Sequence, residues 1–452
     1  MKRQRPLAAI VLAAGKGTRM KSALPKVLHP LAGLPMVHHV LAAVGAAGAD
    51  RRIVVLAPDM TEVAKAVAPV EVAIQDPPLG TGHAVLAARN LLKGFDGDVA
   101  VVFGDTPLIQ PSDFALVREA MGSDAAIGVL GFRPADAARF GRLVVGRDGQ
   151  LERIVEFKDA TAEELKNNFC NSGIMIIDGR HLFALLDRVE NNNAQKEYYL
   201  TSIIELARRG GLKVVATEAP VENVLGVDTR AALAVAEGVM QRRLRERAME
   251  NGATLIDPST VWFSHDTQLG RDVTVGPNVF FGPKVRVADN VRIHAFCHFE
   301  DCTIGEGALV GPYARLRPGA QIGRDVHIGN FVEVKKAVIE DGVKANHLTY
   351  IGDARIGAGS NIGAGTITCN YDGFDKHFTD VGKNVFIGSN SALVAPVKIN
   401  DGAYVGAGSV ITKDVEGDAL AVERSEQRSV GRWGAKFRER KRAEKAAKKA
   451  KE

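Results

Sequence analysis

Hydrophobic side chains recur at every sixth residue through much of the second half of the chain. The period holds over residues 269–299, resumes after a step of five over 304–334, and returns over 387–411. Six residues make one short strand and a turn, and three such units close one triangular coil. The hydrophobic side chain of each unit points toward the axis of that coil. The spacing therefore predicts a left-handed parallel β-helix of hexapeptide repeats. The repeated positions are Leu269, Val275, Phe281, Val287, Ile293, Phe299, Ile304, Val310, Leu316, Ile322, Ile328, Val334, Ile387, Leu393, Ile399, Val405 and Ile411.

Glycine follows many hydrophobic positions of this half, and one segment interrupts the repeat. We expect these glycines to allow the tight corners between strands, because glycine adopts backbone conformations that are closed to other residues. Residues 366–384 break the period, and a solenoid accommodates such an insertion as a loop on one face, often the binding face. This loop carries Asn370, Tyr371 and His377, so it is a candidate active-site loop. The glycines are Gly270, Gly276, Gly282, Gly305, Gly311, Gly323, Gly329, Gly352, Gly357, Gly363, Gly388 and Gly406.

Short apolar runs alternate with amphipathic segments in the first half of the chain. This alternation predicts an α/β domain, Rossmann-like, with a mostly parallel sheet. Residues 229–250 lack proline and are rich in helix formers, which predicts one long linker helix. We therefore divide the chain into an α/β domain (1–228), the linker helix (229–250), the β-helix domain (251–433) and a basic tail (434–452). The expected strands lie within residues 7–14, 52–57, 99–103, 125–131, 173–177 and 213–216, and the clearest helices within 36–47 and 61–68.

Positive charge is concentrated at the C-terminus. Residues 434–452 hold nine Lys or Arg and three Glu, a net of +6 against +5 for the whole chain. The basic sequence pI therefore reports on the tail and says little about function. A basic tail can contact nucleic acid or anionic lipid, but we expect a solvated, disordered terminus.

Cysteine spacing and hydropathy bear on the compartment. Cys170, Cys297, Cys302 and Cys369 form no CxxC pair and no Cys/His metal spacing, so we expect reduced thiols in a cytoplasmic protein. The apolar run 7–14 is short for a signal peptide and continues directly into a glycine turn, so a buried strand explains it better. No stretch reaches the roughly 18 apolar residues that span a membrane.

A glycine-rich turn follows the first expected strand. Residues 12–20 read LAAGKGTRM, and a strand-to-helix turn of this kind brings backbone N–H groups close to phosphates. The turn is neither a Walker A loop nor a full dinucleotide fingerprint. Arg19 and Lys26 supply two cations suited to a triphosphate. A second glycine turn, LGTGHA, occupies residues 79–84.

Asp105 follows another expected strand, within Phe103-Gly104-Asp105. Ligands of open α/β sheets bind beyond the strand ends, where a carboxylate commonly holds Mg²⁺ for nucleotidyl transfer. The alternative is that Asp105 caps a helix over residues 107–117.

These motifs, in this order, resemble one bacterial family: the bifunctional N-acetylglucosamine-1-phosphate uridylyltransferases/glucosamine-1-phosphate N-acetyltransferases. The matching segments are LAAGKGTRM, PK, LGTGHA, FGD, FGR, IVEFKDA, NSGI and GVDTR, and the resemblance covers nearly all of residues 7–433. It implies that residues 1–228 transfer UMP from UTP to N-acetylglucosamine 1-phosphate. The products are pyrophosphate and UDP-N-acetylglucosamine for peptidoglycan and lipopolysaccharide synthesis.

The resemblance also implies site residues in the first half. Arg19, Lys26 and Mg²⁺ would stabilise the negative charge as the sugar phosphate attacks the α-phosphorus in line. Asp105 and Asp228 would hold the Mg²⁺. The residues implied to bind nucleotide or sugar are Leu12, Ala13, Ala14, Gly15, Lys26, Gln75, Gly80, Thr81, Gly104, Asp105, Gly141, Glu156, Asn171 and Asp228.

Polar residues gather where the hexapeptide repeat loosens. Glucosamine 1-phosphate needs cations for its phosphate, which Arg317 and Lys335 can supply, and a base for its ammonium proton. His347 suits the second need because an unperturbed imidazole titrates near neutrality, although a lone histidine on a β-helix is more often a surface residue.

The segments ANHLTYIGDA and TITCNYDGF resemble the acetyltransferase half of the same family. That resemblance implies His347 as general base and a homotrimer with active sites between subunits. It implies sugar-phosphate contacts from Arg317, Lys335, Tyr350 and Asn361, and acetyl-CoA contacts from Ala364, Asn370, Tyr371, Ser389, Ala407 and Arg424.

Three other interpretations stay open at this point. Zinc enzymes of the carbonic-anhydrase type use similar β-helices and need three converging histidines, for which His294, His298, His327 and His347 are available. Some translation-factor subunits join a degenerate nucleotidyltransferase domain to a β-helix as scaffolds. Hexose-phosphate nucleotidyltransferases carry a short β-helix.

One motif departs from the family. The family usually has Gly-Val-Asn-Asn-Arg where this chain has Gly-Val-Asp-Thr-Arg over residues 226–230. Asp228 offers an oxygen where the family's first asparagine contacts metal, and a second carboxylate favours the hard Mg²⁺ ion. The alternative is that Asp228 caps the helix that starts near Thr229.

Overall fold

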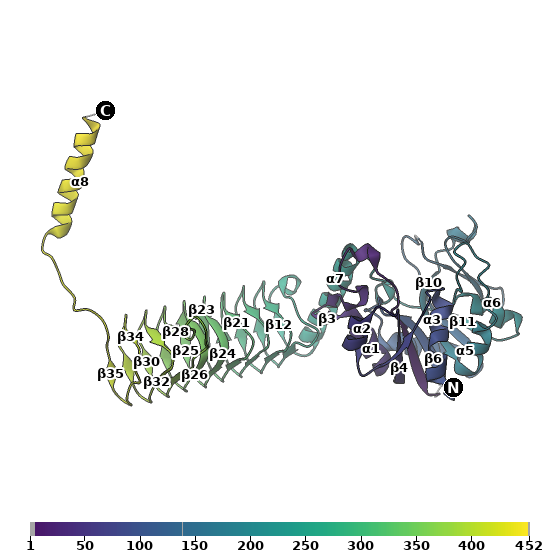
Figure 1. Cartoon of the computed structure of the whole chain (residues 1–452), viewed down its shortest axis with the longest axis horizontal. Helices are drawn as coiled ribbons and strands as arrows, with labels where there is room; N and C mark the ends of the chain where they lie inside the picture. The colour runs from purple at the N-terminus through teal and green to yellow at the C-terminus, as the bar shows by residue number, and fades with distance from the viewer. Residues whose placement is uncertain (1–4, 138, 451–452) are drawn as a thin grey trace. The chain divides into compact units, whose positions relative to one another are not determined.

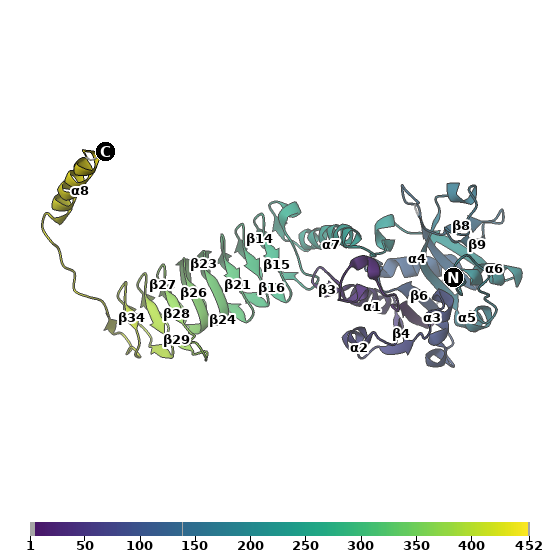
Figure 2. The ribbon, with the colours of Figure 1, turned by 45° about the horizontal axis from the view of Figure 1, so that its top comes forward.

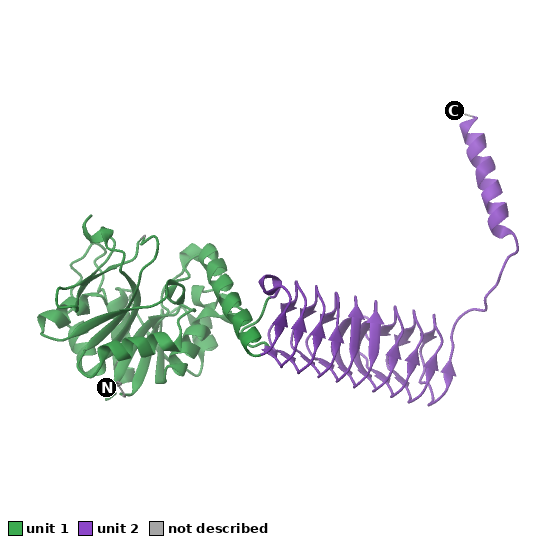
Figure 3. Ribbon diagram, turned by 180° about the vertical axis from the view of Figure 1, so that it is seen from behind, with its two compact units in different colours: residues 1–251, 262–267 green, residues 252–261, 268–452 purple. Residues whose placement is uncertain are grey.

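The computed structural model describes residues 5–137 and 139–450. Contacts divide the chain into two compact units, coloured separately in Figure 3. Unit 1 comprises residues 1–251 and 262–267, and unit 2 comprises residues 252–261 and 268–452. The helix predicted over 229–250 is present as α7 (Arg230–Glu250), but its contacts assign it to unit 1. Residues 262–267 return to unit 1 because Gln241 of α7, which is buried, bonds the backbone of Phe263.

Unit 1 is built on a nine-stranded, mostly parallel sheet (Figure 1). Its main path runs β11-β7-β10-β6-β1-β4-β5, and β8 joins β10 and β9 beside it. Only β10 and the β8–β9 pair run antiparallel to their neighbours. The strands are β1 (Leu7–Leu12), β4 (Ala49–Leu56), β5 (Glu71–Ile74), β6 (Asp98–Phe103), β7 (Ile127–Phe132), β8 (Arg142–Val145), β9 (Leu151–Val155), β10 (Cys170–Asp178) and β11 (Val214–Glu218), with a separate pair β2 (Pro30–Leu31) and β3 (Leu34–Pro35).

Helices cover both faces of this sheet, and the central strand β1 feeds two cores. Alternate side chains of β1 enter opposite cores, Leu7, Ala9 and Val11 on one face and Ala8, Ile10 and Leu12 on the other. A strand buried on both faces reads as a continuous apolar run, which is why this segment imitates a signal peptide. The helices are α1 (Met36–Ala46), α2 (Thr61–Val67) and α4 (Pro111–Met121) on the first face, and α3 (Thr81–Ala87), α5 (Gly179–Leu186) and α6 (Ser202–Arg209) on the second.

All six predicted strands of the first half lie in the sheet, as β1, β4, β6, β7, β10 and β11. The sequence patterns missed β5, β8 and β9. These strands are four or five residues long and partly exposed, so they lack the continuous apolar run that marks the buried strands.

Unit 2 is a left-handed parallel β-helix, seen from two directions in Figures 1 and 2. Every strand pair within it is parallel, and the strands form a ten-stranded and a fourteen-stranded sheet. The ten strands are β12 (Thr254–Leu255), β14 (Thr274–Val275), β17 (Arg292–Ile293), β20 (Leu309–Val310), β23 (His327–Asn330), β25 (Lys344–His347), β27 (Asn361–Ile362), β30 (Phe386–Ile387), β33 (Tyr404–Val405) and β35 (Leu420–Ala421).

The fourteen-stranded sheet supplies the other two faces of the coil, because two long strands turn the corner between them. β24 pairs with β21 through Val334 and with β22 through Ile339. The fourteen strands are β13 (Gln268–Leu269), β15 (Phe280–Phe281), β16 (Val285–Val287), β18 (His298–Phe299), β19 (Cys302–Ile304), β21 (Arg315–Leu316), β22 (Ala320–Ile322), β24 (Glu333–Ile339), β26 (Tyr350–Ile356), β28 (Ile367–Cys369), β29 (Thr379–Val381), β31 (Ala392–Val394), β32 (Val397–Ile399) and β34 (Val410–Ile411).

The hexapeptide period correctly predicted the interior of the coil. Every repeated position from Val275 onward is buried, and only Leu269, in the first coils, is partly exposed. The loop expected over 366–384 is shorter in the structure, because β28 and β29 lie within that range and pair with the next coil. The loop itself spans residues 370–378, where Tyr371 bridges to Lys376.

The expected role of the repeat glycines was wrong. Of the glycines that follow hydrophobic positions, only Gly311 has a positive φ. They are needed for close approach: an added Cβ at Gly276 would lie 2.8 Å from the backbone nitrogen of Ala295 in the next coil. The corner residue with left-handed φ comes two positions later, for example Asn278 with φ 56°.

The tail also differs from its expectation of disorder. Residues Trp433–Lys449 form helix α8, which contains no buried residue. Alanine, lysine, arginine and glutamate dominate this segment, and these are strong helix formers. Within residues 5–137 and 139–450, no helix is both long and apolar enough to cross a membrane.

Candidate active sites

The glycine turn of unit 1 lies where the strand order reverses. β1 lies between β4 and β6, so the connections leave it in both directions, and ligands of open α/β sheets bind at such a switch point. A pocket of 330 Å³ opens there. Its lining comes from both predicted turns and the end of β6: Leu12, Ala13, Ala14, Gly15, Lys26, Val27, Gln75, Pro78, Gly80, Thr81, Ala84, Phe103, Asp105 and Glu197.

At two positions of these turns, a residue with a side chain would strain the backbone and collide with its neighbours. Gly80 has φ +108°, and an added Cβ would lie 2.8 Å from the carbonyl oxygen of Tyr198. Gly17 has φ +59°, and its Cβ would lie 2.5 Å from the Cβ of Lys26. The close approach at Gly80 packs the second glycine turn against residues 197–200. The close approach at Gly17 lets Lys26 pass beside the first glycine turn.

Lys26 is the electrostatic centre of this pocket. Its ammonium contacts a carboxylate oxygen of Asp105 and lies 3.0 Å from Oδ1 of Asp228. Only 13% of the Lys26 side chain is exposed. Burial lowers the pKa of Lys26, but the charges and hydrogen bonds of the two aspartates outweigh burial, so the pKa is raised. Lys26 is therefore held as a cation at the mouth of the glycine turn.

Neither aspartate serves as a helix cap. Helix α4 begins with Gln110 as its N-cap, paired with Asp113 in a capping box, so Asp105 does not cap it. Helix α7 is capped by Thr229, whose Oγ1 accepts the N–H of Ala232 at 3.1 Å. The structure therefore contradicts the alternative that Asp105 or Asp228 caps the helix that follows it.

Asp105 and Asp228 instead converge on a single cation position, which the Lys26 ammonium occupies. Arg19 approaches the second of these carboxylates, with its guanidinium 3.0 Å from Oδ2 of Asp228. Two carboxylates that share one cation form a donor set suited to Mg²⁺, which commonly takes one or two carboxylates and fills its remaining positions with phosphate and water. The residues present therefore fit the implied metal.

A second polar cluster joins the ends of β8, β9 and β10. The N–H of Asn171 donates to the carbonyl of Gly141 at 2.9 Å, and Glu156 approaches Gly141 closely. The hydroxyl of Thr201 donates to Glu156 at 3.0 Å. Burial raises the pKa of Glu156, although the Thr201 hydrogen bond opposes this.

Tyr199 connects this cluster to the pocket. Burial and the nearby carboxylates, those of Glu156 and Glu197 among them, raise the pKa of Tyr199 to about 12. Because Glu197 lines the pocket, the residues implied to bind sugar lie near the residues implied to bind nucleotide. Of the predicted set, Gly104 hydrogen-bonds Leu12 beside the pocket, while Gly141, Glu156 and Asn171 belong to the second cluster.

In unit 2 the polar residues gather around the long strands β24 and β26. Arg317 donates to Glu333 at 2.7 Å, and this hydrogen bond is the main reason that the pKa of Arg317 is raised. Glu333 and Tyr350 are register partners, as are Lys335 and Gly352. The hydroxyl of Tyr350 lies over Gly352, where a Cβ would be 2.3 Å away. Arg317, Lys335 and Tyr350 therefore come together on one side of the coil.

His347 lies at the end of β25, opposite Asn330 on β23. Its Nδ1 is 2.8 Å from Oδ1 of Asn330. With Nδ1 donating to that carbonyl oxygen, Nε2 carries the lone pair and faces away from Asn330 as the available base. His347 is exposed, and Asn361 follows it on β27 as the register partner of Lys344.

The inserted loop is anchored at its first residue. Asn370 is buried and donates to Asp353 at 2.5 Å, while Tyr371 is 56% exposed under the ammonium of Lys376. His377 pairs with Asp372 at 2.7 Å inside the loop. His377 therefore helps to shape the loop. Asn370 and Tyr371 remain the candidates for ligand contact.

The residues implied to contact acetyl-CoA occupy successive coils. The N–H of Asn390 donates to Ala364, and that of Gly408 donates to Ser389 at 2.8 Å. Arg424 then donates to the carbonyl of Ala407 at 2.8 Å. These hydrogen bonds link neighbouring coils, so the four positions form one line parallel to the coil axis.

Comparison with known proteins agrees with this two-part organisation. Residues 9–168 match the MobA-like NTP transferase domain, and residues 301–336 and 378–413 match the bacterial transferase hexapeptide. A protein named Bifunctional protein GlmU from Paramagnetospirillum magneticum is 58% identical over 447 residues, 98% of both chains. The protein of that name from Rhodospirillum rubrum is 57% identical over 95% of this chain and 97% of its own, and that from Zymomonas mobilis is 48% identical over 98% and 99%.

The chain belongs to the GlmU family. It is therefore a bifunctional transferase, with a nucleotidyltransferase unit and a hexapeptide acyltransferase unit. The match of GlmU proteins across both units argues against a scaffold subunit and against a nucleotidyltransferase with a short β-helix. In the described part of the chain, no group of three or more His, Cys, Asp or Glu side chains could hold a metal, so the four candidate zinc histidines do not converge.

Several residues of the candidate sites in this GlmU-family chain belong to no sequence motif. Glu197 and Thr201 reach unit 1's site through tertiary folding, and Asn330, Glu333 and Asp353 support His347, Arg317 and Asn370 from neighbouring coils. One signal was available for the last three. Each lies 16 or 17 residues before or after its partner, about the length of one coil.

Proposed function

We propose that unit 2 acetylates glucosamine 1-phosphate with acetyl-CoA and that unit 1 then transfers UMP from UTP to the N-acetylglucosamine 1-phosphate so formed. The products of the second reaction are UDP-N-acetylglucosamine and pyrophosphate. The observation that carries the proposal is the convergence of Lys26, Asp105 and Asp228 beside the glycine turn, in a chain of the GlmU family.

For uridylyl transfer, the pocket walls would hold the nucleotide while its phosphates lie at the glycine turn. Gln75 donates to the carbonyl of Gly80 at 3.0 Å, which fixes the second glycine turn beside the first. Arg19 and Lys26 supply positive charge where the pyrophosphate leaves, and both side chains lie beside the glycine turn in the free chain. Asp105 and Asp228 would hold Mg²⁺, which supplies charge neutralisation on the phosphates.

The sugar phosphate would bind at the second polar cluster. Glu156 and Asn171 offer oxygen and amide groups to sugar hydroxyls, and the carbonyl of Gly141 helps to hold Asn171 in place by accepting its N–H. Its phosphate oxygen would then attack the α-phosphorus of UTP, forming one P–O bond as the bond to pyrophosphate breaks. The chain supplies positioning and electrostatics, with no covalent intermediate.

For acetyl transfer, Arg317 and Lys335 would bind the phosphate of glucosamine 1-phosphate, with Tyr350 and Asn361 on the sugar. Nε2 of His347 takes the proton of the sugar ammonium, and the freed amine attacks the thioester carbonyl. The C–N bond forms, the C–S bond breaks, and the CoA thiolate leaves and takes the second proton, which the nitrogen loses as the amide forms. Asn330 keeps the imidazole in the tautomer that this step requires.

The acetyl-CoA line and His347 are open on a single copy of unit 2, since His347, Ser389, Ala407 and Arg424 are all exposed. A site that excludes water needs a further wall, and neighbouring copies can provide it. We therefore propose a homotrimer with each acetyltransferase site completed by a partner, as in the family that the sequence resembles. The four free cysteines support a cytoplasmic location.

The test is one incubation with UTP, acetyl-CoA, glucosamine 1-phosphate and Mg²⁺, followed by detection of UDP-N-acetylglucosamine. Each half-reaction is then measured in two variants. His347→Ala should lower acetyl transfer by about 100-fold or more and leave uridylyl transfer unchanged, because the base lies in unit 2. Asp105→Ala should do the reverse. Loss of both activities from either folded variant would contradict the two-site proposal.

A further inference from the structure

Helix α8 is a charged element that neither active site uses. It contains eight Lys or Arg and two Glu within Trp433–Lys449, and none of its residues is buried. An isolated helix of this length is only marginally stable in water, so most protein helices depend on packing against a partner. The composition and the exposure together indicate a surface meant for contact.

Helical periodicity sorts the charges of α8. At 100° per residue, six cations fall within about one third of the circumference, and no acidic residue lies among them. Lys436 and Arg440 lie outside this arc. We call the six residues the cationic face: Arg438, Lys441, Arg442, Lys445, Lys448 and Lys449.

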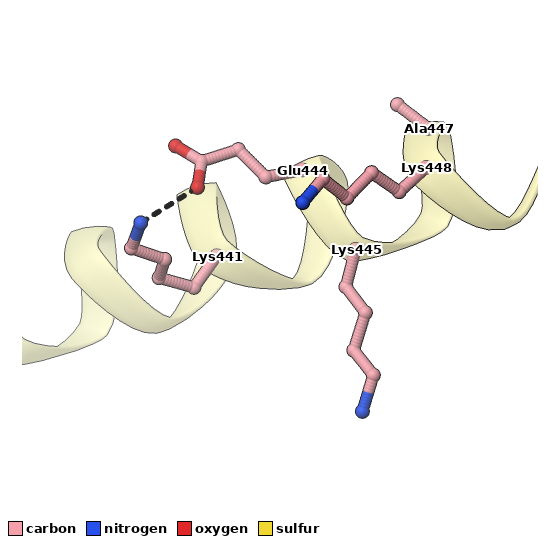
Figure 4. Close-up of a pocket in the computed structure, with 5 residues that line it drawn as sticks. All are labelled: Lys441, Glu444, Lys445, Ala447 and Lys448. Carbon is pink, nitrogen blue, oxygen red and sulfur yellow. Dashed lines mark hydrogen bonds and ion pairs between the residues drawn. The ribbon is translucent and has the colours of Figure 1, made fainter.

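Figure 4 shows part of the cationic face and its border. Lys441 turns toward Glu444, with Nζ 2.7 Å from the carboxylate, whereas Lys445 extends away from it. Glu444 thus lies at the edge of the face and moderates one of the six charges. The helical positions of the other five cations lie on one side of α8.

An aromatic pair borders the same edge. Trp433 and Phe437 stack with ring centroids 5.1 Å apart, and they are 58% and 37% exposed. Lys441 lies 6.0 Å from the centre of the Phe437 ring, so the aromatic pair and the cationic face are continuous. Tryptophan and phenylalanine beside lysine and arginine are typical of helices that lie in a membrane interface.

We propose that the cationic face of α8 binds the surface of a bilayer that contains anionic phospholipid, with Trp433 and Phe437 at the level of the headgroups. A straight row of cations complements a flat anionic surface, and four of the six are lysines, which act as point charges without a preferred bidentate partner. A nucleic acid would be expected to use more arginine and bases stacked on open rings, but here the two rings stack on each other. Binding of this kind is reversible, because it involves one helix and no spanning segment.

The test uses full-length protein and vesicles of phosphatidylglycerol mixed with phosphatidylcholine, or of phosphatidylcholine alone, in a sedimentation assay. Binding should require phosphatidylglycerol and should weaken as salt is added. Each surface cation strengthens adsorption by about fivefold, so Arg442→Gln with Lys445→Gln should weaken it by about 30-fold. The matched control, Lys436→Gln with Arg440→Gln, removes the same charge from outside the face and should weaken it much less.

Tryptophan fluorescence provides a second readout. In a Trp262→Phe background Trp433 is the only tryptophan, and its emission should shift to the blue when phosphatidylglycerol vesicles are added. Uridylyl transfer by all variants should match the parent, which confirms that they fold. The proposal is overturned by absence of vesicle binding, by equal loss in the two double variants, or by an RNA oligonucleotide that binds while the vesicles do not.

Discussion

Replacing Asp228 with asparagine removes one negative charge from the candidate metal site and keeps the shape of the side chain. Asp228 is the position at which the chain departs from the family's usual asparagine, so Asp228→Asn restores the common residue. Its two oxygens lie 3.0 Å from Lys26 and 3.0 Å from Arg19, and both cations stay close to Asp105 or to solvent after the change. The pocket is therefore expected to persist, with a weaker hold on Mg²⁺.

The size of the effect follows from exposure. The Asp228 side chain is 37% exposed, so the interaction strength in water is the appropriate guide. Two unit charges 4 Å apart interact by about 1 kcal/mol in water, and a divalent ion doubles this to about 2 kcal/mol. Asp228→Asn should therefore raise the Mg²⁺ concentration for half-maximal uridylyl transfer by about 30-fold and leave the rate at saturating Mg²⁺ nearly unchanged.

The assay is pyrophosphate release from UTP as a function of Mg²⁺ concentration. Asp187→Asn removes a surface carboxylate that pairs with Arg89, and it should leave the titration unchanged. Asp105→Asn, at a side chain only 17% exposed, should have the larger effect. An unchanged Mg²⁺ titration in Asp228→Asn would refute Asp228 as a ligand. A lost rate at saturating Mg²⁺ would instead mean that Asp228 acts by positioning Lys26 and Arg19.

Three further predictions concern other features of the two units. A fragment of residues 1–267 should unfold at a higher temperature than a fragment of residues 1–250 in a thermal melt. The shorter fragment lacks the backbone of Phe263, so the buried amide of Gln241 loses its hydrogen bonds at a cost of about 1–3 kcal/mol. Equal melting temperatures would contradict this. Burial raises the pKa of Glu156, so the folded state holds the carboxyl proton more tightly than the unfolded state does. The folded state therefore loses stability as the pH rises through this raised pKa. Glu156→Gln should therefore raise the melting temperature more at about pH 7.5 than at about pH 3.5. The same substitution should raise KM for the sugar phosphate by about tenfold. A stability gain that does not depend on pH would be evidence against a raised pKa of Glu156. Asn330→Ala removes the hydrogen bond to His347 and should lower kcat of acetyl transfer by about tenfold with KM and uridylyl transfer unchanged; an unaltered kcat would show that the imidazole needs no orientation.

The parts of the fold that the sequence predicted are those with a strict period. The coil interior follows from one hydrophobic residue in every six, because each coil buries only its own axis. The role of the glycines could not be read from the same pattern. Whether a glycine turns a corner or makes room for the next coil depends on the backbone that passes beside it, and Gly276 does the second. The tail shows the reverse case, since its local composition favoured a helix and net charge alone suggested disorder.

The candidate sites divide in the same way. Gly80 and Lys26 belong to short motifs whose chemistry is local, so the sequence pointed to them and the structure brings them to one pocket. Glu197 reaches that pocket from a segment that lies far along the chain from both glycine turns, and no local pattern marks it. Asn330 looks like any surface asparagine until the coils stack and place it opposite His347.

The residues proposed to contact acetyl-CoA, Ala364, Ser389, Ala407 and Arg424, lie one coil apart along unit 2. Neighbouring strands of a sheet are about 4.8 Å apart, so three steps between coils measure about 14 Å along the axis. If the acyl donor binds as proposed, it would contact the coils one after another along this line. Inserting or deleting one whole coil would lengthen or shorten this line by about 4.8 Å without disturbing the coils on either side, because each coil contacts only its neighbours. Donor length in such enzymes can therefore change in discrete steps, by duplication or loss of a single repeat unit.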